Sequence, residues 1–310
     1  MENNIAISVK NLTKVYNAGS NNEILALDNV TLNISSGSIF GLLGPNGAGK
    51  STFINILADL VRKSDGSIKV LNTDHASNLK KVKSLMGIVP QELNIDPFFT
   101  PFELLEIHAG LYGVPKKDRK TMEILEMLAL EDKAHVYART LSGGMRRRLL
   151  IAKAMVHDPA ILILDEPTAG VDVELRTNLW KNIEKLNSKG KTIIITTHYL
   201  HEAEELCNEI AIIDEGKLIA HDSTSKIKSF IDNREIKIVY NNKDTIDLSS
   251  LKNLNIDLNP NGKTLEINYK PSEIKFNDLL KAINESNIDI EDISIKETRL
   301  EDVFLKLTQS

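Results

Sequence analysis

The chain has 310 residues, 42% of them hydrophobic and 26% charged, and a formal net charge of −5 at pH 7. This composition is typical of a soluble globular protein with one or two domains, with acidic and basic residues mixed. Because proteins that bind nucleic acids usually carry a strongly basic surface, we expect no nucleic acid as the main partner.

Two strands and a tyrosine precede the first glycine-rich segment. Residues 5–10 alternate apolar and other side chains, which indicates a half-buried strand, and a second strand is expected around 27–34 after a polar turn. Tyr16 lies between them. Taken alone it is a surface or core tyrosine, but ahead of a phosphate-binding loop it becomes a candidate for stacking on adenine.

The segment 38–52, SIFGLLGPNGAGKST, combines a buried strand, a glycine-rich loop and the start of a helix. The loop has the phosphate-loop pattern of Gly, four residues, then Gly-Lys-Ser. Glycines let the backbone N–H groups turn inward around a polyphosphate, and the helix N-terminus adds further donors. Lys50 is expected to reach the β- and γ-phosphates, and the Ser51 hydroxyl to face Mg²⁺. The predicted ATP-binding residues are Tyr16, Gly44, Pro45, Asn46, Gly47, Ala48, Gly49, Lys50, Ser51 and Thr52.

The next segment continues an α/β core. A strand is expected at 67–71, a helix at 77–84 and a further strand at 86–89, which ends at Gln91. The Gln91 amide could reach a Mg²⁺-bound water from the mouth of the sheet. The alternative is a polar surface residue.

Residues 92–140 change in character. Prolines punctuate helical patterns at 102–111 and 116–128, and no strand pattern appears, which predicts a helical subdomain inserted into the core. Four apolar side chains lie near its entrance: Leu93, Phe98, Phe99 and Phe102. They form either a local core cluster or an apolar groove for a partner's helix.

A second glycine-containing segment, LSGGM, comprises Leu141, Ser142, Gly143, Gly144 and Met145. An apolar stripe in the residues that follow predicts a helix. Ser142 and the two glycines would then lie at a helix N-terminus and form a second anion site. The run Arg146–Arg148 is interpreted as a solvated helix face.

Two adjacent acids follow an all-apolar strand at 160–164. Asp165 and Glu166 come at its carboxyl end, where an open α/β sheet presents its site. Asp165 could hold Mg²⁺ or its water, and Glu166 could polarise an attacking water. Asp172 follows within the next turn, before a helix over 173–188.

His198 comes after the next predicted strand, 192–196, at the same sheet edge as Gln91 and Glu166. We therefore favour a γ-phosphate role for His198 over a structural histidine. The predicted catalytic residues are Lys50, Gln91, Glu166 and His198, and the predicted metal ligands are Ser51, Gln91 and Asp165. A helix over 199–207 and strands at 210–214 and 217–220 complete the core.

Residues 226–310 differ again. Alternating strand patterns at 235–240, 264–269 and 288–295 flank a helix around 273–283. The chain ends in an amphipathic helical stripe of Leu300, Val303, Phe304 and Leu307. The prediction is a small α+β domain without catalytic residues, after a first domain over 1–225 whose helical subdomain spans about 92–158.

Cysteine content and hydropathy limit the class further. Cys207 is the only cysteine, which excludes an intrachain disulfide and favours the reducing cytoplasm. The N-terminal residues MENNIAISVK lack the apolar core of a signal peptide. No apolar run approaches the length of a membrane-spanning helix, about 18 residues. A role at a membrane would therefore need a partner that provides the pore.

The ordered set of motifs resembles the ATPase subunit of ABC transporters. The matching pieces are Tyr16, GPNGAGKS at 44–51, Gln91, LSGGM at 141–145, ILILDE at 161–166, AGVD at 169–172 and His198. Met145, where that family usually has Gln, is similar to the ABC-2 type exporter branch. The stretches TAGVDVELR and TTHYLHEAE and the tail EDISIKETRLEDVFLKLT resemble the same branch.

The resemblance implies an α/β fold: a P-loop ATPase core with an inserted helical subdomain, plus a small C-terminal α+β domain. It implies ATP and Mg²⁺, and a homodimer or heterodimer of ATPase subunits that closes head to tail. Each ATP would lie between the phosphate loop of one subunit and the LSGGM segment of the other. Glu166 would act as general base, His198 would sense the γ-phosphate, and Asp172 would cross the dimer seam.

The resemblance also implies an integral-membrane ABC-2 permease as a partner. The chain would be cytoplasmic and peripheral on the inner face of the cell membrane, and Gln91 would link Mg²⁺ to the permease contact. A soluble ABC ATPase acting on ribosomes or DNA is an alternative, disfavoured by the single ATPase module and the lack of a heptad run. A non-hydrolysing regulatory subunit is another, against which Lys50, Asp165, Glu166 and His198 argue.

Overall fold

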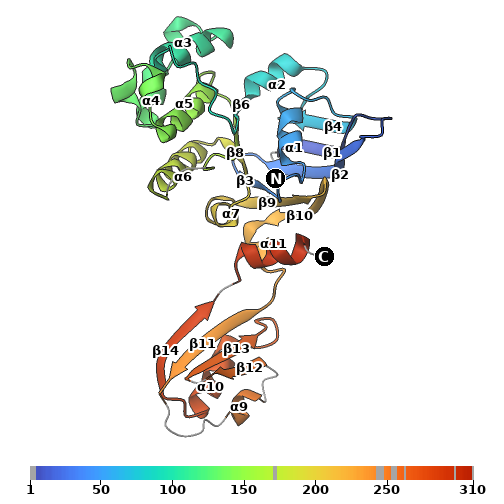
Figure 1. Ribbon diagram of the computed structural model, residues 1–310, viewed down its shortest axis with the longest axis vertical. Helices are drawn as coiled ribbons and strands as arrows, with labels where there is room; N and C mark the ends of the chain where they lie inside the picture. The colour runs from blue at the N-terminus through green and yellow to red at the C-terminus, as the bar shows by residue number, and fades with distance from the viewer. Residues whose placement is uncertain are drawn as a thin grey trace. The chain divides into compact units, whose positions relative to one another are not determined.

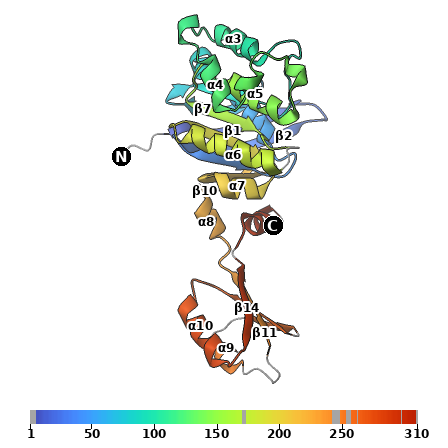
Figure 2. The same cartoon turned by 90° about the vertical axis from the view of Figure 1, so that its left-hand side faces the viewer.

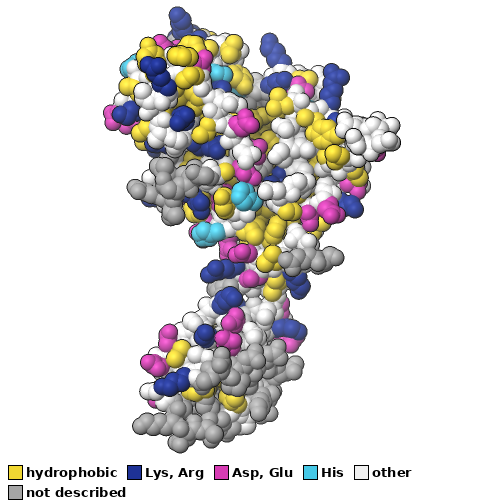
Figure 3. Space-filling view, in the orientation of Figure 1, with side chains coloured by type: hydrophobic (Ala, Val, Ile, Leu, Met, Phe, Trp, Pro, Cys, Tyr) yellow, Lys and Arg dark blue, Asp and Glu magenta, His cyan; other side chains and the backbone are white. Residues whose placement is uncertain are grey.

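The structure, a computed structural model, divides the chain into two compact units, Met1–Thr224 and Ser225–Ser310, which we treat separately (Figure 1, Figure 2). It describes residues 5–169, 173–241, 248–252, 257–261, 263–296 and 298–308. On the described part of the face in Figure 3, acidic and basic side chains are interspersed, in keeping with the mixed composition.

An antiparallel sheet opens the first unit, with the strand order β2-β1-β4-β5. Its strands are β1 (Ile5–Tyr16), β2 (Ile24–Ser35), β4 (Asp65–Val70) and β5 (Thr73–Asp74). β1 is longer than the sequence pattern predicted and includes Tyr16, which lies opposite Ile24 of β2. The end of β1 is therefore fixed by pairing across the polar turn.

A six-stranded sheet forms the centre of the first unit, in the order β10-β9-β3-β8-β7-β6. Its strands are β3 (Ile39–Leu43), β6 (Met86–Val89), β7 (Ile161–Asp165), β8 (Thr192–Thr197), β9 (Glu209–Asp214) and β10 (Lys217–Ser223). Pairing is parallel from β9 to β6, and β10 runs antiparallel to β9. The carboxyl ends of β3, β7 and β8 thus meet at one sheet edge.

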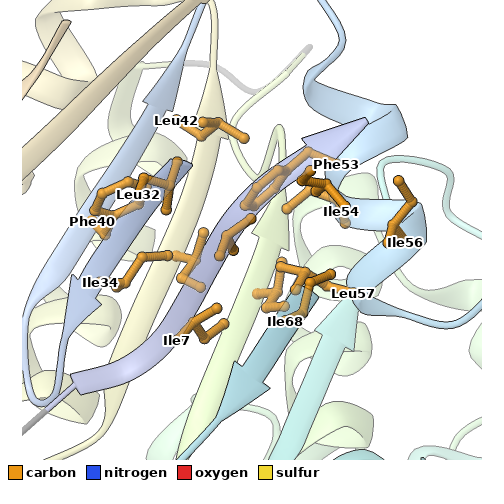
Figure 4. Packing of buried hydrophobic residues seen from close by; sticks show 14 of the residues in the cluster. Ile7, Leu32, Ile34, Phe40, Leu42, Phe53, Ile54, Ile56, Leu57 and Ile68 are labelled. Carbon is orange, nitrogen blue, oxygen red and sulfur yellow. The ribbon is translucent and has the colours of Figure 1, made fainter. Parts of the chain in front are cut away.

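One apolar core joins the two sheets through helix α1 (Lys50–Leu57). Ile7 and Leu32 come from the antiparallel sheet, Phe40 from β3 and Phe53 from α1, and all four are buried (Figure 4). The α/β class predicted from the sequence is confirmed. Helices α2 (Leu79–Leu85), α6 (Val173–Asn187) and α7 (Leu200–Leu206) complete the elements around the central sheet.

The segment between β6 and β7 is helical. It contains α3 (Pro101–Leu111), α4 (Thr121–Met127) and α5 (Gly143–Met155), with 3₁₀ turns at Lys116–Asp118, Glu131–Lys133 and Ala138–Thr140. The prediction of one helix over 116–128 is wrong, because the chain is extended at Arg119. The Arg119 side chain instead donates to the Val114 carbonyl at 3.0 Å and to Glu106 at 2.7 Å.

The second unit contains an antiparallel sheet in the order β12-β13-β11-β14. Its strands are β11 (Arg234–Tyr240), β12 (Asp257–Asn261), β13 (Thr264–Tyr269) and β14 (Ile290–Lys296), and its helices include α9 (Ser249–Lys252), α10 (Phe276–Glu285) and α11 (Leu300–Thr308). Short helix α8 (Thr224–Lys228) lies at the division between the units. In α11, Leu300 and Val303 are buried, whereas Phe304 and Leu307 are only half-buried.

Candidate functional site

A hollow of about 640 Å³ lies at the sheet edge where β3, β7 and β8 end. Its walls come from six segments that are far apart in the sequence. The lining residues are Ile24, Leu25, Ala26, Asn46, Gly47, Gly49, Lys50, Ser51, Thr52, Gln91, Glu166, Ala169, His198, Glu215 and Gly216. Most of the glycine-rich loop is thus brought together with Gln91, Glu166 and His198.

The loop between β3 and α1 requires glycine where it approaches other backbone closely. A Cβ at Gly44 would lie 2.2 Å from the Ile213 carbonyl oxygen. Gly49 caps α1 with φ +107°, and a Cβ there would lie 2.5 Å from the Ala26 oxygen. The turn therefore presents α1 end-on to the hollow, with the unpaired N–H groups of its first turn available for an anion.

Lys50 begins α1 and is buried beneath the loop. Its ammonium donates to the carbonyl oxygens of Gly44 at 2.8 Å and Pro45 at 2.9 Å. These bonds hold the ammonium against the predicted phosphate-binding loop and use two of its three N–H donors. Burial lowers the pKa of Lys50, and the negative charges of Glu166 and Asp165 oppose that shift.

Asp165 is the last residue of β7, and the backbone turns away from the strand at Glu166. The Thr196 hydroxyl of β8 donates to the Asp165 carboxylate and accepts the backbone N–H of Glu166 at 3.0 Å. Burial is the main reason that the pKa of Asp165 is raised, although the bond from Thr196 lowers it. Glu166 adopts a left-handed backbone, φ +45°, which is rare for a residue with a Cβ and redirects its side chain into the hollow.

Glu166 lies between two of the other predicted catalytic residues. Its Oε2 accepts the Gln91 side-chain N–H at 3.0 Å, and its Oε1 lies 3.1 Å from His198 Nδ1. The Glu166 side chain is 13% exposed and His198 38% exposed, so the carboxylate is sheltered while the imidazole faces outward. Three polar groups from the ends of β6, β7 and β8 thus form one hydrogen-bonded cluster.

The remaining ATP-binding residues predicted from sequence lie around the hollow or beneath it. Pro45 holds Lys50, and the Ala48 carbonyl accepts the Gly216 N–H at 3.0 Å. Tyr16 is half-buried opposite Ile24, with the Lys14 ammonium 4.6 Å from its ring centroid. Tyr16 is not among the lining residues, whereas its strand partner Ile24 is.

Sequence reasoning missed one wall of the hollow. Ile24 and Leu25 are 58% and 48% exposed, large values for apolar side chains, and they lie across from the loop with Glu215. Gly216 is the other missed contact, and its carbonyl accepts the Asp28 N–H at 2.9 Å. The sequence offered only a weak signal, two apolar residues directly after a polar turn.

The LSGGM segment lies elsewhere. Ser142 caps α5 by accepting the Met145 N–H at 3.3 Å, so the two glycines begin this helix. Within the described part of the chain, residues 141–145 do not line the hollow. The interpretation of Arg146–Arg148 as a solvated helix face is wrong for Arg147, which is buried and donates to the Pro90 carbonyl at 3.0 Å, next to Gln91. Asp172 lies outside the described residues.

The chemistry of the cluster suits a polyphosphate. Backbone N–H groups and Lys50 supply positive potential, and Ser51 and Gln91 supply oxygen atoms. Asp165, at the end of β7, is not among the lining residues, and its carboxylate accepts from Thr196. Among the described residues, His, Cys, Asp and Glu side chains form no group of three that could hold a metal ion without other ligands. Among the described helices, none combines the length and the apolar character needed to cross a membrane.

Comparison with known proteins identifies the family. Residues 27–169 match the family model described as ABC transporter. A protein named Nod factor export ATP-binding protein I from Cupriavidus metallidurans is 38% identical over 216 residues, which cover 69% of this chain and 70% of the relative. Its namesake from Ralstonia nicotianae is 40% identical, over 69% of this chain and 66% of the relative.

Solved structures agree with the sequence relatives. A dimeric, post-hydrolysis ATP-binding cassette bound to ADP and Pi is 29% identical, with a TM-score of 0.62, and covers 70% of this chain and 98% of its own. The cbiO1 protein of Clostridium perfringens, part of an ABC transporter complex, is 26% identical with a TM-score of 0.64, and covers 72% of this chain and 90% of its own. The chain therefore belongs to the ABC transporter family, as an ATP-binding, ATP-hydrolysing subunit built on the P-loop fold.

Proposed function

We propose that the chain is the motor subunit of an ABC-2 type exporter and works in pairs with a separate membrane permease. Met145 in the LSGGM segment and the tail from Glu291 to Thr308 support this branch. The relatives from Cupriavidus and Ralstonia carry export in their names. The transported compound is recognised by the permease in this proposal, so the ATPase residues do not specify it.

The observation that carries the proposal is the separation of the two anion sites. The phosphate loop lines the hollow, whereas the helix start at Ser142 and Gly143 does not, among the described residues. A second helix N-terminus has no use in a site that one chain closes alone. In a head-to-tail pair, each LSGGM segment would close on the ATP held by the partner. Asp172 is expected at the seam of that pair.

The cluster around Glu166 supports a direct route for hydrolysis. The Glu166 carboxylate takes a proton from a water whose oxygen attacks the γ-phosphorus, and the bond to the bridging oxygen of ADP breaks. His198, 3.1 Å from Glu166, would contact the γ-phosphate and hold the carboxylate in position. Lys50 would stabilise the charge on the β- and γ-phosphate oxygens. Tyr16, beside Ile24 at the rim, would stack on adenine.

The residues present fit Mg²⁺. Ser51, Gln91 and Asp165 offer a hydroxyl, an amide and a carboxylate oxygen, the hard ligands that this ion prefers, and phosphate and water oxygens would supply its other ligands. Bound there, the ion would neutralise charge on the β- and γ-phosphates. Gln91 also donates to Glu166, so its side chain would join the metal site to the base.

The permease contact is proposed next to Gln91. Leu93, Phe98 and Phe99 are 38%, 71% and 37% exposed, which favours the groove over the local core cluster for these three. Phe102, the fourth side chain of the group, is half-buried and packs against His135. Exposed apolar side chains that follow a catalytic residue by a few positions could transmit closure of the pair to a partner helix. The chain would then lie on the cytoplasmic face of the membrane.

The experiment is purification of the tagged full-length chain from detergent-solubilised membranes of its own cell. A protein with about six membrane spans, each of roughly 20 apolar residues, should co-purify in a stoichiometric ratio. Phe98→Ala should reduce that recovery at least fivefold, while the exposed Leu60→Ala, far from Gln91 in the sequence, should not. Recovery of ribosomes in place of a membrane protein would contradict the proposal.

A further inference from the structure

The strand β14 leaves an apolar strip at the edge of the sheet in the second unit. Ile290, Ile293 and Ile295 are 39%, 40% and 45% exposed. Ile293 and Ile295 lie directly opposite Ile238 and Ile236 of β11, both fully buried. Directly opposed residues share a face of the sheet, so these two isoleucines lie on its apolar face.

The helices of this unit cover that face only in part. α9 and α10 lie on one side of the sheet (Figure 2). Leu279 and Ile283 of α10 pack in the same cluster as the inward residues of β11 and β13, and the isoleucines of β14 are not members of that cluster. Among the described strands, β14 has β11 on one side and no strand on the other. An edge strand of this kind is a template for further strand pairing.

The sequence of β14 is complementary to itself. In an antiparallel pair related by a two-fold axis at Ser294, Ile293 faces the second copy's Ile295, and Asp292 faces its Lys296. Both pairs occur twice, and the charged pair lies on the polar face with Glu235 and Lys237. A register shifted by one residue would place charged side chains opposite isoleucines and lose both matches.

The contacts of the charged residues are compatible with this register. The Asp292 carboxylate accepts the backbone N–H of Ile293 at 2.9 Å, and a strand bond from this N–H to a second copy would replace that side-chain bond. Lys296 is 60% exposed and reaches Glu235 at 3.5 Å, so its other N–H donors can serve a second carboxylate.

We propose that two copies of this chain pair through β14, and that the two sheets join into one of eight strands. The four facing isoleucines would lie at the centre of the joined apolar face. This contact is independent of the ATP sites. If the subunits also pair through ATP, each contact raises the effective concentration for the other.

A cysteine at Ser294 tests the pairing, because a residue on a two-fold axis meets its own copy. Directly opposed residues have Cβ atoms about 4.5–5.5 Å apart, close to what a disulfide needs. Full-length Ser294→Cys should form a disulfide-linked dimer under mild oxidation without nucleotide. The native Cys207 is buried, so it does not compete.

The matched control is Lys237→Cys, which lies opposite Ser294 on the same polar face but one strand inward. Its copy in the joined sheet would lie about 14 Å away, three strand spacings, beyond the reach of a disulfide. Ser294→Cys should crosslink at least tenfold more than Lys237→Cys. Equal crosslinking of the two variants would overturn the proposal.

Charge reversal tests the register. In the Ser294→Cys background, Asp292→Lys alone or Lys296→Asp alone places like charges opposite each other, and crosslinking should fall at least fivefold. When the two variants are mixed, with one carrying a larger tag, the dimer of mixed size should crosslink as well as the parent. Undiminished crosslinking of the single variants, or no recovery in the mixture, would contradict this register.

Discussion

Replacing Glu166 with glutamine isolates the proton-accepting role from the shape of the side chain. The amide keeps the volume of Glu166, and its one oxygen can still accept the Gln91 N–H that the carboxylate accepts at 3.0 Å. It cannot hold a proton from water, and it removes the negative charge beside His198. Binding of ATP should therefore survive, whereas hydrolysis should not.

The magnitude follows from the sheltered position of the carboxylate. A positioned general base contributes about 10²- to 10⁴-fold, which corresponds to roughly 3–5 kcal/mol of the activation free energy. With its side chain only 13% exposed and both oxygens in hydrogen bonds, Glu166 is well positioned, so Glu166→Gln should lose activity in this range. The assay is steady-state phosphate release, with nucleotide affinity measured separately.

Glu215 supplies the control, because it lines the same hollow but is not part of the cluster around Glu166. Glu215→Gln should retain hydrolysis within about threefold. If Glu166→Gln also stays within about threefold of the parent, Glu166 is not the base. A matched loss of ATP affinity in Glu166→Gln would instead show that the carboxylate acts in binding.

Three further predictions follow from the rim, the domain boundary and the half-buried His157. Tyr16→Ala should weaken nucleotide binding by about 1–3 kcal/mol while Tyr16→Phe is nearly silent, and equal losses in a binding titration would point to the hydroxyl instead of stacking. A chain ending at 225 should remain folded and bind ATP, and a soluble, folded truncation without ATP affinity would place the boundary elsewhere. His157 stacks on Tyr112 at 3.7 Å, and burial lowers its pKa. The unfolded chain therefore binds a proton at His157 more readily than the folded chain does. The stabilisation by neutral His157 is present above about pH 6.5 and is lost as pH falls through the lowered pKa, by up to about 1.4 kcal/mol per pH unit. The free energy of unfolding, measured by urea titration between pH 7 and pH 5, should depend less steeply on pH in His157→Phe than in the parent. An unchanged pH dependence would show that His157 is not the group responsible.

The central elements of the fold are readable from sequence because their patterns are local. β3 and β8 are buried along their whole length, and their sequences, IFGLL and TIIITT, centre on apolar residues without the polar alternation of a half-exposed strand. The phosphate loop follows from glycine spacing. The order of parallel strands then brings Gln91, Glu166 and His198 to one edge. Their contacts with each other follow from that topology.

The missed features depend on contacts between distant segments. The wall formed by Ile24, Leu25 and Glu215 belongs to a turn and a strand end whose composition carries no chemistry of its own. The break at Arg119 reflects its bonds to Val114 and Glu106, which override the helical pattern. Strand β12 and helix α9 are too short, at five and four residues, to show a period.

The most direct test of the shared ATP site mixes two damaged chains. Lys50→Ala removes the phosphate lysine, and Gly143→Asp places a carboxylate where the partner's γ-phosphate is expected. A Cβ at Gly143 would meet nothing within 4 Å, so the second change should leave the fold intact. Both chains also carry Glu166→Gln, which holds the closed state, and the quantity measured is nucleotide trapped per dimer.

A pair made of two identical mutants has two damaged sites, whereas a mixed pair has one site with both lesions and one with neither. The account predicts that ATP trapping reappears in the mixture and approaches one nucleotide per mixed dimer. If mixed dimers demonstrably form and trap no more ATP than either variant alone, the shared site is contradicted, and Ser142 must serve its own chain.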